Sequence, residues 1–238
     1  MATYTGVVTT GIYCRAGCPA QPLRRNMLPF GHPAAAEAAG FRPCLRCRPD
    51  RMPDVGWIAA PELVCRAMHS IADGALDDTT EDDLATRLGV SARHLRRLFA
   101  QYVGATPSEV ARSRRAHFAR RLLDDTDLPM TQIATAAGFN TVRQMNRVML
   151  EIFQFTPSEL RAKRRRPDRL VVDGGLELRV PYRPPLAWTP LLEFLAPRAI
   201  PGVEAVDLDA RTYRRVADID GSPGVIEVWD VPREQALR

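Results

Sequence analysis

The chain has 238 residues, of which 45% are hydrophobic and 26% are charged. This length allows two or three small domains, and this composition excludes an intrinsically disordered chain. The net charge is only +5, and no apolar stretch is long enough to cross a membrane, so the sequence indicates neither a strong polycation nor a membrane protein. The N-terminus lacks the features of a secretion signal, and we therefore expect a cytoplasmic protein.

The first motif along the chain is a set of four cysteines in two close pairs. Cys14 and Cys18 form one pair, Cys44 and Cys47 form the other, and residues 19–43 lie between them. This spacing is typical of a four-cysteine zinc site, and in a cytosolic chain zinc is favoured over disulfides. Spacing alone favours a structural Zn²⁺. We expect a small α+β zinc domain over residues 1–52.

Arginines gather around these cysteines. Residues 1–50 contain six arginines but only two acidic residues, and a second basic cluster lies at 161–169. Clustered basic charge is typical of proteins that bind polyanions. The pattern favours a zinc site that approaches a nucleic-acid backbone. The arginines next to the cysteines in sequence are Arg15, Arg42, Arg46 and Arg48.

Residues 81–165 contain a diverged duplication. The segment 84–91 corresponds to 133–140, and Thr-Pro-Ser-Glu at 106–109 recurs at 156–159. In each copy the Thr suits a helix N-cap, the Pro suits the first helical position, and the Glu suits a capping box. The sequence therefore predicts a helix that begins at each of these motifs.

Each copy also predicts a helix-turn-helix unit. Gly89 and Gly138 suit the left-handed residue that ends a short helix, and a second helix follows each turn, at about 91–101 and 141–151. A longer helix, at about 107–123, joins the two units. The residues expected to face outward from the second helices are Arg93, Arg96, Arg97, Arg143, Gln144, Asn146 and Arg147.

These outward faces have two interpretations. They are either solvated helix surfaces, or they enter the DNA major groove, where Arg, Gln and Asn bond bidentately to guanine or adenine. For one such helix the two interpretations would be equally supported, whereas two copies favour DNA binding. The arrangement resembles the AraC-type DNA-binding domain, and we expect an all-α domain of that type over residues 58–166. The resemblance implies that the bases are read by Arg93, Arg96, Arg97, Arg143, Gln144 and Arg147.

Beyond residue 166 the pattern changes. The predicted elements are a strand at 176–180, a short helix at 190–195, and strands at 203–208, 213–219 and 225–231. The last two flank Asp220-Gly221, a strong hairpin signal. We therefore expect a β-α-β-β-β fragment over residues 170–238, which makes the whole chain multidomain and mainly α.

Parts of this fragment resemble the N-terminal domain of AlkA-type 3-methyladenine DNA glycosylases. The segments that carry the resemblance are 180–186, 198–203 and 224–228. The chain ends at Arg238, before the domain that holds the catalytic Asp of that family. We therefore expect a truncated fusion without glycosylase activity.

The cysteine pairs lie in longer motifs, Thr-Thr-Gly-Ile-Tyr-Cys14-Arg and Gly-Phe-Arg-Pro-Cys44-Leu-Arg-Cys47. Next to an AraC-type domain, these motifs resemble the N-terminal domain of the Ada family, which combines methylphosphotriester repair with transcriptional activation. The resemblance implies that Cys14 irreversibly accepts a methyl group, once per protein. It also implies that Zn²⁺ is held by Cys14, Cys18, Cys44 and Cys47. The DNA contacts implied for this domain are Thr10, Arg15, Arg42 and Arg46.

The same resemblance implies the partners of the chain. They are double-stranded DNA, both as methylated backbone and as promoter sites, and RNA polymerase. We expect a monomer in the bacterial cytoplasm, associated with the nucleoid. Two other functions stay open. One is a transcription regulator with purely structural zinc, and the other is a truncated DNA-3-methyladenine glycosylase fusion.

The remaining cysteine and the histidines carry no further site. Cys65 lies in a helical apolar pattern and is expected to be a small buried hydrophobic residue. The histidines show neither metal-ligand nor triad spacing, and we expect packing or surface roles for all four: His32, His69, His94 and His117.

Overall fold

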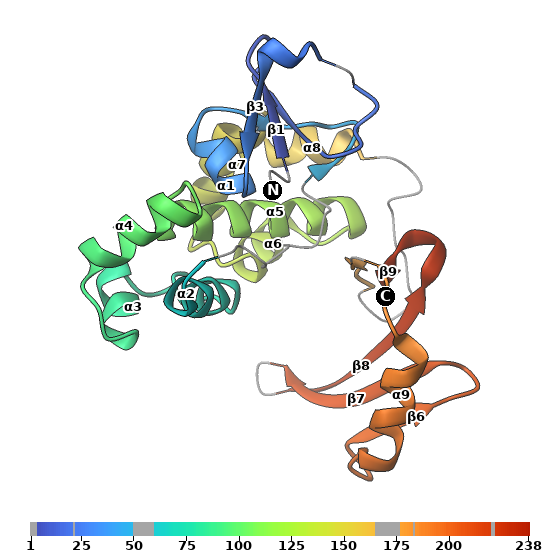
Figure 1. The fold of residues 1–238 in the computed structure, drawn as a ribbon. Coiled ribbons are helices and arrows are strands. Elements are labelled where there is room, and N and C mark those ends of the chain that lie inside the picture. Colours follow the sequence, from blue (N-terminus) through green and yellow to red (C-terminus); the bar gives the residue numbers. More distant parts are fainter. Residues whose placement is uncertain (1–3, 21, 50–59, 165–176, 183, 220–221) are drawn as a thin grey trace. The chain divides into compact units, whose positions relative to one another are not determined.

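The computed structural model describes residues 4–20, 22–49, 60–164, 177–182, 184–219 and 222–238 (Figure 1). The chain forms two compact units, Met1–Arg169 and Leu170–Arg238. The predicted zinc and helix-turn-helix domains therefore lie within one unit. The predicted boundaries at residues 52, 58, 166 and 170 fall outside the described residues, as do Leu176 and the Asp220-Gly221 turn.

A small mixed sheet forms the N-terminal part of the first unit. Its strands are β1 (Tyr4–Val7), β2 (Ile12–Arg15), β3 (Met27–Phe30) and β4 (Arg42–Pro43), in the order β3-β1-β2-β4. A 3₁₀ turn, η1 (Arg24–Asn26), precedes β3, and the helix α1 (Pro33–Ala38) precedes β4. The core of this part is aromatic, with Tyr4, Tyr13 and Phe41 buried around Ala36. This confirms the predicted small α+β domain.

Seven helices follow in the described part of the first unit. They are α2 (Glu62–Ala72), α3 (Glu81–Arg87), α4 (Ala92–Tyr102), α5 (Pro107–Asp125), α6 (Met130–Ala136), α7 (Val142–Phe153) and α8 (Pro157–Ala162). The helices α3 and α4 form the first predicted helix-turn-helix unit, and α6 and α7 form the second. The long helix α5 joins them (Figure 1).

Local sequence explains where these helices begin. The side chains of Thr106 and Thr156 cap α5 and α8, Pro occupies the first turn, and Glu109 and Glu159 close the capping boxes. These hydrogen bonds satisfy backbone N–H groups that have no partner within the helix. The predicted capping motifs are confirmed at both copies.

The apolar faces of the helices form the core. Leu95 and Phe99 of α4 are fully buried, as are Met145 and Met149 of α7. Cys65 on α2 is only half-buried, and its thiol contacts the carbonyl of Ala60 at 3.8 Å. It is therefore less enclosed than the sequence suggested.

The second unit contains a five-stranded antiparallel sheet in the order β5-β9-β8-β7-β6. Its elements are β5 (Val180–Pro181), α9 (Trp188–Leu195), the 3₁₀ turns η4 (Ala196–Arg198) and η5 (Pro232–Glu234), β6 (Glu204–Asp207), β7 (Thr212–Ile219), β8 (Ser222–Val231) and β9 (Ala236–Leu237). The predicted β-α-β-β-β order is present. The short strand β9, which the sequence did not predict, pairs with both β5 and β8.

Among the described residues, no helix combines the length and apolarity that a membrane span requires.

The two glycine turns provide a matched test of backbone strain and packing. Gly89 and Gly138 have φ of +75° and +77°, but a Cβ at Gly89 would meet nothing within 4 Å, whereas one at Gly138 would lie 2.6 Å from the Asp77 carboxyl group. Asp77 forms ion pairs with Arg114 and Arg115 and is not free to move aside.

We expect Gly89→Ala to lower the free energy of unfolding by about 1 kcal/mol, from the left-handed backbone alone. Gly138→Ala should lower the free energy of unfolding by about 1–3 kcal/mol more than Gly89→Ala does, because the added methyl group overpacks against Asp77. Urea unfolding of both variants checks this. Equal losses would contradict the packing contribution at Gly138.

Candidate metal centre and nucleic-acid interface

The four predicted metal ligands converge in the structure. Cys14 ends the buried part of β2, Cys18 lies in the loop that follows, and Cys44 and Cys47 follow β4. The strands β2 and β4 pair in parallel, and the N–H of Cys44 donates to the carbonyl of Tyr13 at 3.0 Å. This pairing brings the two cysteine pairs, which are distant in sequence, to one end of the sheet.

The sulfur atoms fit a tetrahedral metal ion. All four lie within 4.8 Å of one another. A Zn–S bond of 2.3 Å in a tetrahedron requires sulfur atoms about 3.8 Å apart, so a small contraction would complete the site. Three of the cysteines are buried and Cys18 is half-buried.

The electrostatics of the cluster also favour a cation. Burial, with the nearby Cys18, Cys44 and Cys47, raises the pKa of the Cys14 thiol far above its ordinary value. Burial likewise raises the pKa of Cys47 to about 12. Although burial opposes it, backbone N–H groups of Cys47 and Arg46 lower the pKa of Cys44. The raised pKa values of Cys14 and Cys47 oppose their ionisation, and a bound cation would stabilise the thiolates.

Three of the four arginines near the cysteines form a collar, which we define as Arg15, Arg42 and Arg46. Arg15 and Arg46 are exposed, and Arg42 on β4 is half-buried. Thr10, in the turn between β1 and β2, is also exposed. Of the predicted DNA-contact residues of this domain, three are thus open to solvent and Arg42 is half-buried.

Arg48 does not belong to this collar, which corrects the sequence interpretation. It forms an ion pair with Asp124 of α5, and its side chain is only 14% exposed. Asp124 is fully buried and also bonds Arg120 at 3.0 Å. Arg48 thus joins the segment that follows β4 to a buried carboxylate of α5.

A second contact joins the metal-binding part to α5. Oε1 of Glu37 on α1 lies 2.6 Å from Nε2 of His117, and the hydroxyl of Tyr13 donates to the same oxygen at 2.8 Å. Tyr13 directly precedes Cys14, just as Arg48 directly follows Cys47. Tyr13 and Arg48, each next to a predicted metal ligand in the sequence, therefore both contact α5, the helix between the two helix-turn-helix units.

The recognition helices α4 and α7 present the predicted polar faces. Arg93, Arg96 and Arg97 are exposed on α4, and Arg143 and Arg147 are exposed on α7. Gln144 is half-buried, and its side-chain oxygen accepts from the N–H of Asn140 at 3.0 Å. Gln144 thus contributes to the start of α7.

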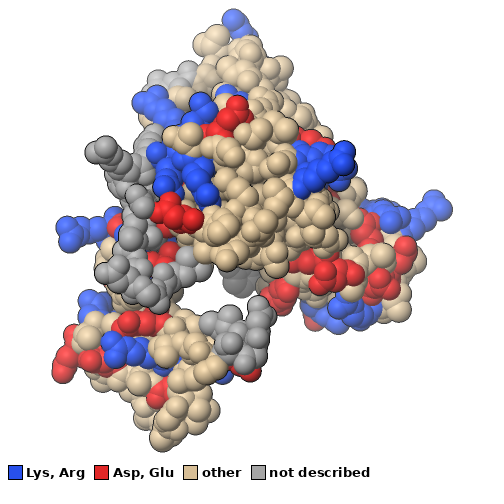
Figure 2. Space-filling view, turned by 180° about the vertical axis from the view of Figure 1, so that it is seen from behind, with Lys and Arg blue, Asp and Glu red and all other residues tan. Residues whose placement is uncertain are grey.

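Charges of both signs are intermixed over the face of the molecule that Figure 2 shows. No single basic face dominates that view, in keeping with the modest net charge. Contacts with DNA would therefore depend on local groups of arginines more than on the overall field.

Sequence reasoning missed three side chains that organise these surfaces. His117 was assigned a packing or surface role, but it bonds Glu37 across the two parts of the first unit. Glu37 and Glu81 were not singled out, and Glu81 bonds Arg96 on the first recognition helix. A buried or paired carboxylate looks like any other in a sequence, so no local signal could have identified them.

The fold and the site define a class of proteins that join a four-cysteine metal domain to a pair of helix-turn-helix units. Three families match successive parts of the chain: the metal binding domain of Ada at residues 2–50, a helix-turn-helix domain at 84–163, and the AlkA N-terminal domain at 177–238. In this order along the chain, its parts are therefore similar to the metal binding domain of Ada, to a helix-turn-helix domain and to the N-terminal domain of AlkA. Zn²⁺ is the cofactor of its metal-binding domain.

The names of similar proteins pair transcriptional activation with DNA repair. A "Probable bifunctional transcriptional activator/DNA repair enzyme AlkA" of Mycobacterium tuberculosis is 39% identical over 95% of this chain and 46% of its own length. AdaA of Bacillus subtilis is 30% identical over 57% of this chain and 63% of its own length. Ada of Escherichia coli is 34% identical over 56% of this chain and 36% of its own length. The chain thus spans about half the length of the mycobacterial relative.

The metal centre can be tested with two cysteine variants. Cys44→Ser removes a ligand, so the protein should lose its Zn²⁺ and the sheet β1–β4 should lose metal-derived stability on the order of 10 kcal/mol. Cys65 lies outside the cluster, so Cys65→Ser should keep both its Zn²⁺ and its metal-derived stability. Zinc content by elemental mass spectrometry and thermal unfolding check this. Retention of zinc by Cys44→Ser would contradict the assigned ligand set.

The Glu37–His117 contact predicts a pH dependence of stability. Although burial opposes it, the charge of His117 and hydrogen bonds from His117, Ser113 and Tyr13 lower the pKa of Glu37. A lowered folded-state pKa stabilises the native protein above the ordinary carboxyl value of about 4.3, and this stability is lost as the pH falls further.

Wild-type protein should therefore lose stability below about pH 4.3 more steeply than Glu37→Gln, which has no proton to bind at this position. Urea unfolding midpoints measured between neutral and acidic pH check this. Parallel pH profiles of the two proteins would show that Glu37 contributes nothing through its charge.

Proposed function

We propose that this chain transfers a methyl group from a DNA methylphosphotriester to Cys14, irreversibly and once per protein. We propose further that this transfer increases sequence-specific binding to promoter DNA and activates transcription. The observation that carries the proposal is the convergence of four thiols, with arginines next to them in sequence, in a segment that matches the metal binding domain of Ada. The names of the relatives, which pair transcriptional activation with DNA repair, support it.

The thiolate is the nucleophile of the proposed reaction. An ordinary thiol has a pKa of about 8.5 and is mostly protonated at neutral pH. Zn²⁺, when bound, supplies the chemistry that keeps the sulfur deprotonated and nucleophilic. Sγ of Cys14 forms a bond to the methyl carbon while the bond from that carbon to the phosphate oxygen breaks. The electron pair stays on the oxygen, and an ordinary phosphodiester is restored.

The charge of the metal centre explains both the choice of substrate and the proposed increase in DNA binding after methyl transfer. Four thiolates around one Zn²⁺ carry a formal charge of roughly −2, which repels ordinary phosphates. A methylphosphotriester is neutral and escapes this repulsion. Methylation turns Cys14 into a neutral thioether, so the centre loses one negative charge and the collar of Arg15, Arg42 and Arg46 holds the DNA backbone more tightly.

The two recognition helices supply the sequence specificity in this proposal. Exposed arginines on α4 and α7 are suited to guanine edges in the major groove, and α5 joins the two units within one chain. We propose that the bound protein is a monomer, that it acts at the bacterial nucleoid, and that it recruits RNA polymerase. The base-reading residues proposed are Arg93, Arg96, Arg97, Arg143, Gln144 and Arg147.

We propose that the second unit supplies no base excision on its own. Two carboxylates of this unit are bonded to neighbouring side chains, Glu227 to Arg214 and Asp230 to Tyr182. Excision also requires a pocket that holds a flipped base. Incubation of the chain with duplex DNA that carries 3-methyladenine, followed by analysis for released bases, tests this point.

The proposed transfer is tested by incubating the zinc-loaded chain with duplex DNA that carries a methylphosphotriester. The protein should gain the mass of one methyl group, and peptide mapping should place it on Cys14. Cys14→Ser should gain none, whereas Cys65→Ser should react like the wild type.

Peptide mapping also separates the alternatives. Cys18 is the more exposed thiol of its pair, and a methyl group found there would contradict Cys14 as the acceptor. Failure to gain any methyl group, with zinc and DNA binding intact, would favour a regulator with purely structural zinc.

A further inference from the structure

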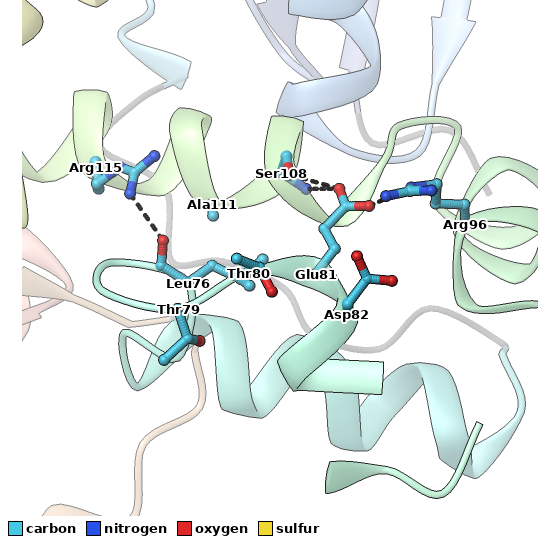
Figure 3. A pocket seen from close by; sticks show the side chains of 9 residues that line it. All are labelled: Leu76, Thr79, Thr80, Glu81, Asp82, Arg96, Ser108, Ala111 and Arg115. Atoms are coloured by element: carbon cyan, nitrogen blue, oxygen red, sulfur yellow. Dashed lines mark hydrogen bonds and ion pairs between the residues drawn. The ribbon is translucent and has the colours of Figure 1, made fainter. Parts of the chain in front are cut away.

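A carboxylate from the preceding helix holds the first recognition helix. Glu81 is the first residue of α3, and its carboxylate accepts a hydrogen bond from Nε of Arg96 on α4 (Figure 3). Its other oxygen accepts from the backbone N–H of Ser108 at 2.9 Å and from the hydroxyl of Ser108 at 2.5 Å. One side chain, only 9% exposed, thus joins α3, α4 and the start of α5.

The bond through Nε leaves the rest of the Arg96 guanidinium available. A guanidinium presents five N–H donors in a rigid plane, and the donors on the edge away from Glu81 remain open to a second acceptor. The Arg96 side chain is 52% exposed. Two coplanar N–H groups match O6 and N7 of guanine in the major groove. An arginine already held in place also loses less rotamer entropy on binding.

The second repeat shows that the helix-turn-helix fold does not require this carboxylate. Met130 is the first residue of α6, as Glu81 is of α3, and Asn146 is the fifth residue of α7, as Arg96 is of α4. Ser108 has its counterpart in Ser158, so the serine is present in both copies. The acidic residue accompanies the arginine and is absent where the arginine is absent.

The environment keeps Glu81 charged. Burial opposes its ionisation, but hydrogen bonds from Ser108 and the nearby Arg96 outweigh burial and lower its pKa. Asp82, the next residue, lines the same open pocket of about 360 Å³ but is exposed. It carries the same charge without the bond to Arg96 and therefore provides a matched control.

We propose that Glu81 is the positioning residue for Arg96, and that the pair sets the preference for a guanine in the DNA site of the first repeat. This inference rests on the proposed sequence-specific binding of DNA. Arg96 contacts the base, whereas Glu81 acts through Arg96 and fixes the direction of its open edge. The second repeat, with Met130 and Asn146, has no equivalent pair.

The test is a selection of binding sites from a pool of randomised DNA duplexes by the full zinc-loaded chain, followed by sequencing. Wild-type protein should select guanine at one position that Arg96→Asn no longer selects. Glu81→Met, which introduces the residue of the second repeat, should weaken that preference about tenfold and leave the preferences of the second half-site unchanged. Asp82→Asn should select the wild-type site.

Two further variants separate positioning from simple stabilisation. Ser108→Ala removes a hydroxyl donor to Glu81 without touching Arg96, so it should lower thermal stability without changing the selected bases. Glu81→Gln keeps the shape of the side chain but loses its charge, and it should weaken the guanine preference even if Glu81→Met folds poorly.

The possible outcomes are distinct. Unchanged guanine selection by Glu81→Gln and Glu81→Met would overturn the inference, and so would a stronger selection, which would mean that Glu81 withdraws Arg96 from DNA. A wild-type chain that selects no sequence at all would overturn the proposed sequence-specific function, and this inference with it.

Discussion

The packing of the metal-binding part against α5 is the constraint on which the first unit depends. Among the described residues, two ion pairs contribute to it, Glu37 with His117 and Arg48 with Asp124. His117 and Asp124 are seven residues apart, about two turns of the helix, and therefore lie on the same side of α5. Removing Arg48 or His117 would take one cationic partner from a buried carboxylate, so these bonds favour one relative placement of the sheet and the helix.

Because α5 also joins the two helix-turn-helix units, this contact places the metal centre and both recognition helices on one scaffold. The His117 ring packs 5.7 Å from that of Phe153, the last residue of α7. Tyr13 thus contacts a histidine that packs against the second recognition helix, and Tyr13 is the neighbour of Cys14. A change in charge at the cysteines would therefore occur at a fixed position relative to the helix faces that we propose read DNA.

Local patterns in the sequence predicted most helices and strands, whereas the long-range contacts between side chains depend on packing. The Thr-Pro-Ser-Glu motifs and the left-handed glycines carry their own hydrogen-bond chemistry and fixed the starts and ends of helices. The cysteine spacing predicted the metal cluster for a similar reason. By contrast, Arg48 meets a partner 76 residues away and Glu37 one 80 residues away, and β9 has only two residues. No short window of sequence contains such information.

The uninterrupted helix α5 has a consequence for the genome that such a protein would regulate. Its 19 residues form a rod about 28 Å long without a flexible joint. One inserted base pair turns the far half of a duplex by about 35° as well as moving it away. A promoter could therefore accumulate single-base changes while both contacts are kept. One inserted base pair between the two contact sites would, however, prevent the protein from binding both sites at once.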